Sequence, residues 1–167
     1  IELIVASASK LLAGLREGEF DVVVTAATVS EDLYRIDQLY DESYKVVVSK
    51  SHPLSERDAI SLSTLAETDM LDRPNCEMRD ALHGACADQG HELYAAYRSN
   101  RVDWLVELAR QGLGAVILPT TAIPADSGLV SIPIDGLEIS RTVSALRYRH
   151  QTTRPETNDL IREIARV

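Results

Sequence analysis

The chain has 167 residues, of which 45% are hydrophobic and 26% are charged, as in an ordinary globular protein with one core or two small lobes. Its 26 acidic residues outnumber its 17 basic residues, the formal net charge is -9, and no run of Lys or Arg could follow a phosphate backbone, which argues against direct binding of nucleic acid. No apolar stretch approaches the roughly 20 residues that a membrane-spanning helix needs, which argues against a membrane protein.

Apolar runs alternate with helical patterns along the whole chain, which predicts an α/β fold rather than a helical bundle or a β-sandwich. Between the first two predicted strands, the sequence "SASKLLAGLREGEFD" predicts a helix that Ser7 or Ser9 caps and Gly18 ends. A short helix is predicted after Ser61. The predicted strands are residues 2–6, 21–25, 44–49, 70–71, 93–97, 115–118, 129–133 and 142–148.

Three longer helices are predicted in the second half of the chain. Asn75 is a suitable N-cap for a helix over residues 75–89, and Gly90 is its expected left-handed stop. Apolar residues recur with the helical period over residues 102–109, which predicts the next helix. The last helix is expected over residues 156–167.

At Ser7, Asn75 and Ser99, a predicted strand leads into a predicted helix through a small polar residue. Such a junction leaves free backbone N–H groups at the carboxyl end of the strand, which is where open α/β sheets bind ligands. Because the N-terminal end of a helix also carries the positive end of its dipole, several such ends in one crevice would suit a carboxylate, a phosphate or another polar small molecule.

The chain opens on Ile1, with neither an initiator Met nor a signal-peptide pattern, so it is interpreted as a fragment of a longer protein. Its two cysteines do not make a disulfide framework and favour a reducing cytoplasm. The four histidines have no spacing typical of a metal site, and no pair of carboxylates or Ser–His couple gathers at the predicted strand ends. We therefore expect no enzyme, no metal and no cofactor.

Six segments of the sequence, in this order, resemble the effector-binding domain of LysR-type transcriptional regulators: "LREGEFDVVV", "YKVVVSKSHPLS", "SLSTLAE", "DRPNCE", "ELARQGLGAVILPTTAIP" and "GLVSIPI". The resemblance covers nearly the whole chain, from Ile1 into the last predicted helix. It implies a two-lobed α/β fold like that of type 2 periplasmic solute-binding proteins, with two crossover strands and a small-molecule effector in the cleft. By the resemblance, residues 1–43 and 140–167 form lobe I, and residues 44–139 form lobe II.

The resemblance also implies parts that are missing from this chain. These are the family's first strand and helix, which would precede Ile1, and an N-terminal winged helix-turn-helix through which family members bind DNA. The expected function is that of the ligand-sensing domain of a bacterial LysR-type regulator, in which an unidentified polar or anionic effector modulates DNA binding by the separate domain. A cytoplasmic homodimer or homotetramer without membrane contact is expected.

By position in the family pattern, the effector site has contributions from both lobes. Some relatives that bind aromatic carboxylates use an arginine near the position of Ala26, so a strong carboxylate clamp is in doubt there, although helix N-termini can still hold an anion. The effector-binding residues that the resemblance implies are Ser7, Ser9, Thr25, Ala26, Asn75, Cys76, Glu77, Ser99, Asn100, Pro119 and Thr120.

Cys76 is predicted at the first helical position, where the helix dipole and free amides favour a thiolate. Three interpretations are open: a buried residue of the pocket wall, a contact with the effector, and a redox sensor. LysR-type peroxide sensors resemble this region and use two cysteines in a reversible disulfide. Within one predicted helix, Cys76 and Cys86 would lie about 15 Å apart along the axis, whereas a disulfide needs Cα atoms within about 7 Å. Only unfolding of the helix would join them.

Other residues of the implied site also have two interpretations. Ser7, Ser9 and Ser99 can be simple helix caps. Glu77 can bind an ammonium or hydroxyl group of the effector, or it can only complement the positive end of the helix. Arg73 can form a surface ion pair or bind an anionic ligand. Two alternative functions stay open: a solute-binding protein of a transporter, and a thiol-based redox sensor of the same family.

Overall fold

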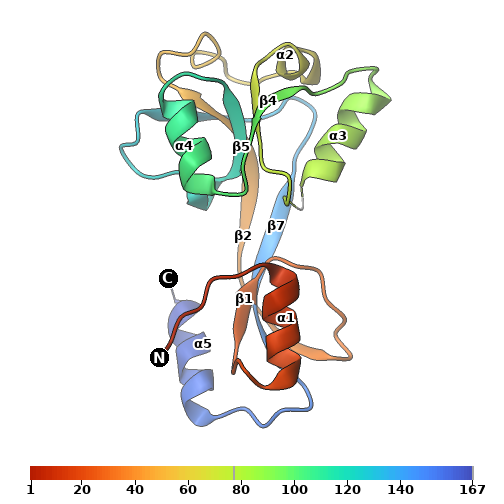
Figure 1. The fold of residues 1–167 in the computed structure, drawn as a ribbon, viewed down its shortest axis with the longest axis vertical. Helices are drawn as coiled ribbons and strands as arrows, with labels where there is room; N and C mark the ends of the chain where they lie inside the picture. The colour runs from red at the N-terminus through yellow and green to blue at the C-terminus, as the bar shows by residue number, and fades with distance from the viewer. Residues whose placement is uncertain (77, 167) are drawn as a thin grey trace. The chain divides into compact units, whose positions relative to one another are not determined.

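The computed structural model describes residues 1–76 and 78–166, and Figure 1 labels its helices and strands. Contacts divide the chain into two compact units: unit 1 is Ile1–Asp41 with Arg141–Val167, and unit 2 is Glu42–Ser140. Helices and strands occur in both units, so the predicted α/β class is confirmed. Strand β2 (Tyr34–Ser49) begins in unit 1 and ends in unit 2.

In unit 1, strand β7 lies between β1 and the first part of β2. β1 and β7 are antiparallel, with Val23 opposite Leu146. The core of the unit contains both of these residues together with Leu15 and Tyr34, so the first helix packs its apolar face against the sheet. The elements of unit 1, besides the first part of β2, are α1 (Ala8–Glu17), β1 (Val23–Thr25), β7 (Ser140–Tyr148) and α5 (Pro155–Ile164).

The two ends of α1 agree with the prediction from the sequence, but the prediction of a strand before this helix is wrong. Ser7 caps the helix by accepting a hydrogen bond from the backbone N–H of Lys10, and Gly18, at φ 80°, ends it. The predicted strand over residues 2–6 has no regular secondary structure, and the side chains of Leu3 and Val5 are 87% and 91% exposed. A strand forms where a neighbour accepts its backbone hydrogen bonds, and no described strand pairs with this segment.

Unit 2 is built on a mixed sheet in the order β6-β2-β5-β3-β4. The end of β2 is antiparallel to both β5 and β6, whereas β3 is parallel to β4 and to β5. The elements of unit 2, besides the end of β2, are α2 (Leu62–Ala66), β3 (Met70–Asp72), α3 (Arg79–Asp88), β4 (Ala95–Arg98), α4 (Val102–Arg110), β5 (Ala115–Pro119), the 3-10 helix η1 (Thr120–Ala122) and β6 (Leu129–Ile132).

Helices cover both faces of the unit 2 sheet. Val46 and Val48 of β2 pack with Leu82 of α3 in one core. Val47, between them, packs with Leu105 of α4 in a second core. Because successive side chains of a strand point to opposite faces, α3 and α4 lie on opposite sides of the sheet, which agrees with Figure 1.

Helix α3 begins later than predicted. Its first residue is Arg79, and Asn75 is not its N-cap, because the residue at that position is Met78, whose side chain makes no capping hydrogen bond. The physical reason is tertiary: Cys76 and Met78 are buried in the core, and the backbone N–H of Asn75 donates to a neighbouring loop. Packing therefore outweighs the local capping preference. The predicted left-handed stop at Gly90 is confirmed, with φ 75°.

Candidate functional site

The strands β3, β4 and β5 of unit 2 are parallel neighbours, so their carboxyl ends lie at the same edge of the sheet. These ends are Asp72, Arg98 and Pro119. The segments that follow the three strands hold the site residues predicted for this part of the chain. The sheet topology therefore brings three separate stretches of sequence to one edge, although Glu77 lies outside the described residues.

Two of these segments are joined by hydrogen bonds. The backbone N–H of Asn75 donates to Oδ1 of Asn100 over 3.1 Å, and the N–H of Ser99 donates to the carbonyl of Asp72 over 3.0 Å. Oγ of Ser99 accepts from the N–H of Arg101 at 3.1 Å, so Ser99 shapes the turn before α4 instead of capping the helix. Asn75 and Asn100 are exposed, which leaves the Asn75 side chain accessible to a ligand.

The segment after β5 holds Pro119 and Thr120. Pro119 is buried and pairs with Tyr44 of β2, whereas Thr120 is half-buried at the start of η1. The next residue, Thr121, was not predicted, yet its hydroxyl donates to the buried carboxylate of Glu42. Glu42 is the first residue of unit 2, so this hydrogen bond fixes η1 on the strand that enters the unit.

Cys76 is buried, with 9% of its surface exposed, and its thiol lies 3.9 Å from the hydroxyl oxygen of Tyr44. It precedes the first residue of α3, so the prediction of Cys76 at the first helical position is wrong. The 15 Å axial separation predicted for one shared helix does not apply, because only Cys86 belongs to α3. Cys86 is 1% exposed, and burial raises the pKa of its thiol; both cysteines are free thiols.

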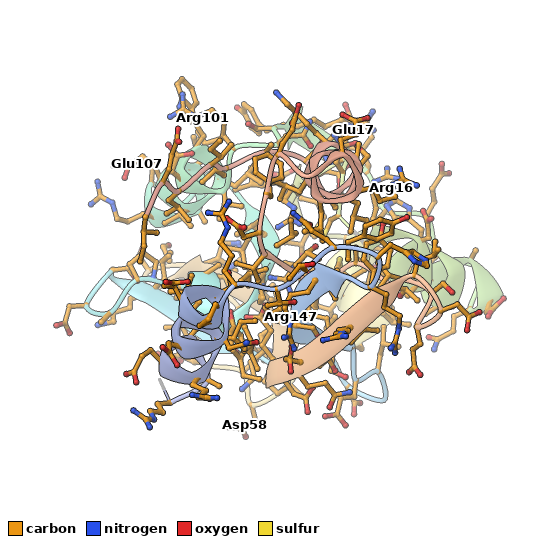
Figure 2. The ribbon with its side chains drawn as sticks, turned by 90° about the horizontal axis from the view of Figure 1, so that it is seen from below. Arg16, Glu17, Asp58, Arg101, Glu107 and Arg147 are labelled. Atoms are coloured by element: carbon orange, nitrogen blue, oxygen red, sulfur yellow. The ribbon has the colours of Figure 1, made fainter. Side chains whose placement is uncertain are left out.

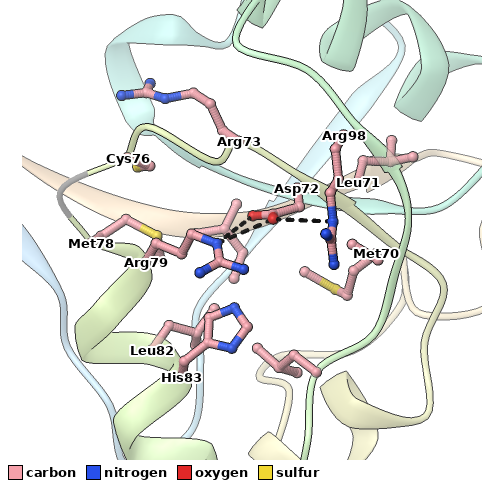
Figure 3. A pocket seen from close by; sticks show the side chains of 13 residues that line it. Met70, Leu71, Asp72, Arg73, Cys76, Met78, Arg79, Leu82, His83 and Arg98 are labelled. Atoms are coloured by element: carbon pink, nitrogen blue, oxygen red, sulfur yellow. Dashed lines mark hydrogen bonds and ion pairs between the residues drawn. The ribbon is translucent and has the colours of Figure 1, made fainter.

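Sequence reasoning missed an ionic group at the same edge. Nε of Arg79 lies 3.2 and 3.1 Å from the two carboxylate oxygens of Asp72, and Nε of Arg98 lies 3.8 Å from one of them. Figure 3 shows the Asp72 carboxylate between the two guanidinium groups. The signal available in the sequence was that Asp72 and Arg98 each follow a predicted strand of a parallel sheet, where their side chains meet.

In unit 1, the predicted residues form two small polar groups. The hydroxyl oxygens of Ser7 and Ser9 lie 3.1 Å apart, and both residues are exposed. Thr25 ends β1, and its Oγ1 accepts a hydrogen bond of 3.1 Å from the N–H of Ala27, while Ala26 is half-buried. Each of these hydrogen bonds is local, so in unit 1 the serines serve the start of α1 and the threonine serves the turn after β1.

The part of the chain that the structure describes offers neither a metal site nor a membrane-spanning helix. Within it, no group of three or more His, Cys, Asp or Glu side chains is placed to hold a metal ion. No described helix is both long and apolar enough to cross a membrane. The chemistry of the described site is therefore that of hydrogen bonds, two arginines, one aspartate and two buried thiols.

Comparison with known proteins gives matches over most or all of the chain. The family model described as "LysR substrate binding domain" matches residues 1–167. The "Hydrogen peroxide-inducible genes activator" of Dickeya chrysanthemi is 28% identical over 149 residues, which are 86% of this chain and 48% of that protein. The chain thus spans about half the length of this curated relative.

Solved structures have the same fold. The oxidized form of OxyR is 25% identical, with a TM-score of 0.74, and the match covers 96% of this chain and 78% of that chain. The effector binding domain of QuiR in complex with shikimate is 16% identical, with a TM-score of 0.77, and the match covers 96% of this chain and 77% of that chain. The expected α/β fold of the effector-binding type is therefore confirmed.

Proposed function

Because the chain belongs to the family of LysR substrate binding domains, we propose that it is the effector-binding domain of a bacterial LysR-type transcriptional regulator. The family match over residues 1–167 carries this proposal. Units 1 and 2 correspond to the two lobes, and the effector is a polar or anionic small molecule. The whole protein acts in the cytoplasm as a dimer or tetramer and binds DNA through a separate N-terminal winged helix-turn-helix.

The mechanism is a shift between two populations of the domain. An effector that contacts residues of both units favours one arrangement of the units, and this arrangement changes how the DNA-binding parts are held. The coupling cannot exceed the difference in the effector's affinity for the two states. In unit 2, we assign the contacts to the segments after β3, β4 and β5; in unit 1, we assign them to Ser7, Ser9, Thr25 and Ala26.

A thermal-shift screen with small carboxylates, phosphates, amino acids and sugars tests this proposal. A ligand at 100 times its Kd should stabilise the native state by about 2.7 kcal/mol and raise Tm accordingly. The rise should shrink in Asn75→Ala and Thr25→Ala, and it should persist in the control Ser131→Ala, a change at an exposed position of β6. A rise that both site variants retain in full would place the ligand elsewhere.

A thiol-based response to peroxide is the second candidate function, and two observations favour it. The relative from Dickeya chrysanthemi is named for hydrogen peroxide, and the oxidized form of OxyR shares the fold. Cys76 lies outside α3, so the two thiols are not held apart by one helix. In this reaction, the Cys76 thiolate attacks one oxygen of hydrogen peroxide, the O–O bond breaks, and the other oxygen leaves as hydroxide, which gives a sulfenic acid. The Cys86 thiol then attacks the sulfenic sulfur, and the sulfenic hydroxyl leaves as water with the thiol proton as the disulfide forms.

Mass spectrometry of the intact chain after mild peroxide treatment separates the two candidates. A sensor should lose two hydrogens by forming an intramolecular disulfide between Cys76 and Cys86, and this loss should be abolished in Cys86→Ala. An effector domain without redox function should bind its ligand equally well before and after peroxide, and in Cys86→Ala. The transporter alternative has no comparable observation in its favour, since the reported relative is a gene activator.

A further inference from the structure

A cavity of about 40 Å³ lies in unit 2 between α3 and strands β3 and β4 (Figure 3). Its floor is apolar, with Met70, Leu82 and Ile117 among its residues, and all three are buried in the same core. Its polar side holds Asp72, Arg79 and Arg98. One water needs about 10–15 Å³ of such space, so the cavity has room for about three waters, or for one group of similar size.

Positive charge exceeds negative charge in the group formed by Asp72, Arg79 and Arg98 on the polar side of the cavity. In the described part of the chain, the Asp72 carboxylate is paired with the Nε groups of Arg79 and Arg98, at 3.1 and 3.8 Å. Within the described residues, the terminal Nη groups of these two arginines make no hydrogen bond, and Figure 3 shows them pointing away from Asp72, toward His83 and Met70. One carboxylate between two guanidinium groups leaves one positive charge, in a chain whose net charge is -9.

Guanidinium groups with free donors are well suited to a carboxylate, because the paired N–H groups match its two oxygens. The arginines remain accessible at the mouth, with side-chain exposures of 31% for Arg79 and 59% for Arg98. The apolar floor adds a preference for a short hydrocarbon part over a second polar group. A phosphate would place its additional oxygens against methionine and leucine side chains, without partners.

We propose that this cavity binds the carboxylate and first carbons of a short-chain monocarboxylic acid, with Arg98 and Arg79 as its anion-binding residues. This gives unit 2 the carboxylate clamp that the position of Ala26 in unit 1 does not supply. The inference rests on the proposed function in one respect, because it takes this acid to be all or part of the effector.

The chain contains two methionines, Met70 and Met78, and both line the cavity. Their methyl groups, labelled with ¹³C, therefore give two NMR signals that report on this site. Propionate, titrated at constant ionic strength, should shift both signals with saturation, whereas propionamide, which lacks the charge, should not. Arg98→Gln should weaken propionate binding by about tenfold or more, since it removes a charge-assisted contact.

Two further variants make the test specific. Arg110→Gln removes a positive charge from the exposed face of α4 and should leave the propionate titration unchanged. Ala95→Leu fills the cavity from β4 and should abolish the shifts while the chain stays folded. Equal shifts with propionamide, or equal affinity in Arg98→Gln, would overturn the inference.

The outcome is separable from that of the proposed function. A propionate titration that leaves both methionine signals unshifted, together with another small molecule that stabilises the chain in a manner dependent on Asn75 and Thr25, would refute this site and leave the proposed function standing. Propionate binding that depends on Arg98 but is unchanged in Asn75→Ala and Thr25→Ala would support the site and contradict the effector contacts assigned under the proposed function.

Discussion

The backbone N–H of Asn75 and the side-chain oxygen of Asn100 form a 3.1 Å hydrogen bond that joins the segments after β3 and β4, 25 residues apart in the sequence. The bond uses the main chain of one residue and the side chain of the other. The side chain of Asn100 is therefore part of this hydrogen bond, whereas the side chain of Asn75 is not. Both residues are exposed, and both were predicted as effector contacts.

Asn100→Ala should lower the free energy of unfolding by about 0.5–1.5 kcal/mol, the usual net value of one hydrogen bond. Asn75→Ala retains the backbone donor and should leave the free energy of unfolding almost unchanged, while it weakens effector binding. Urea denaturation of the two variants measures the difference. Equal destabilisation would mean that the side chain of Asn75 has a structural role that the hydrogen bonds do not reveal.

Replacing either of two glycines by alanine should change the free energy of unfolding, but in opposite directions. Gly84 lies within α3, and a Cβ there would meet no other atom within 4 Å, so Gly84→Ala should stabilise the chain by about 0.5–1 kcal/mol through helix propensity. At Gly114, φ is 150° and a Cβ would collide with the backbone carbonyl of Asp69, so Gly114→Ala should destabilise it by more than about 1 kcal/mol. Thermal unfolding of both variants gives the signs directly.

The exposed carboxylate of Glu107 on α4, labelled in Figure 2, should titrate at a lower pH than an ordinary glutamate, with a small effect on stability because the pair is exposed. Its hydrogen bonds from Arg110 and then from Gln111 lower its pKa to about 2. Because this value lies below the ordinary pKa of about 4.3, the stabilising contribution is present above that pH and is lost as the pH falls toward 2. NMR titration should find the Glu107 pKa raised toward its ordinary value in Arg110→Gln, with the part of the shift caused by Gln111 retained. An unchanged low pKa would assign the shift to another neighbour.

Burial should make the thiol of Cys86 react slowly with alkylating reagents. Because burial raises its pKa and the thiolate is the reactive form, iodoacetamide at pH 8 should modify Cys86 far more slowly in the native chain than in denaturant. The stabilising contribution of this group is present below the unfolded pKa of about 8.5 and is lost as the pH rises through the higher folded value. Mass spectrometry of the labelled peptides measures the rates, and fast native labelling would contradict the buried position.

The elements with a regular apolar pattern in the sequence were the part of the fold that was predicted well. Helix α4 follows its apolar spacing, with Leu105 and Ala109 fully buried, and the apolar run at the end of β2 is buried on both faces of the sheet, as expected for a central strand. These elements are dictated by local patterns that repeat over many residues. The Ser7 cap is also local, because the donor and the acceptor are three residues apart.

Features that depend on distant partners were not predictable in the same way. Asn75 has the sequence signature of a cap, but the burial of Cys76 and the bond to Asn100 decide its conformation. The ion pair of Asp72 with Arg79 and Arg98 combines two strands and a helix, whose relative register no local pattern contains. The apolar residues 2–6 resembled a strand, yet strand formation requires a pairing partner that the sequence of the segment does not specify.

The alternation of Val46, Val47 and Val48 between the two cores of unit 2 has an evolutionary consequence. Side chains that are neighbours in the sequence pack in separate cores. A change of side-chain volume in the core on the α3 side can therefore be compensated by a second substitution in that core, while the core on the α4 side stays as it is. Met70, Leu82 and Ile117, which form the apolar floor of the cavity, all belong to the layer on the α3 side. Descendants of such a chain can acquire a preference for a different small molecule while the opposite layer keeps the sheet folded.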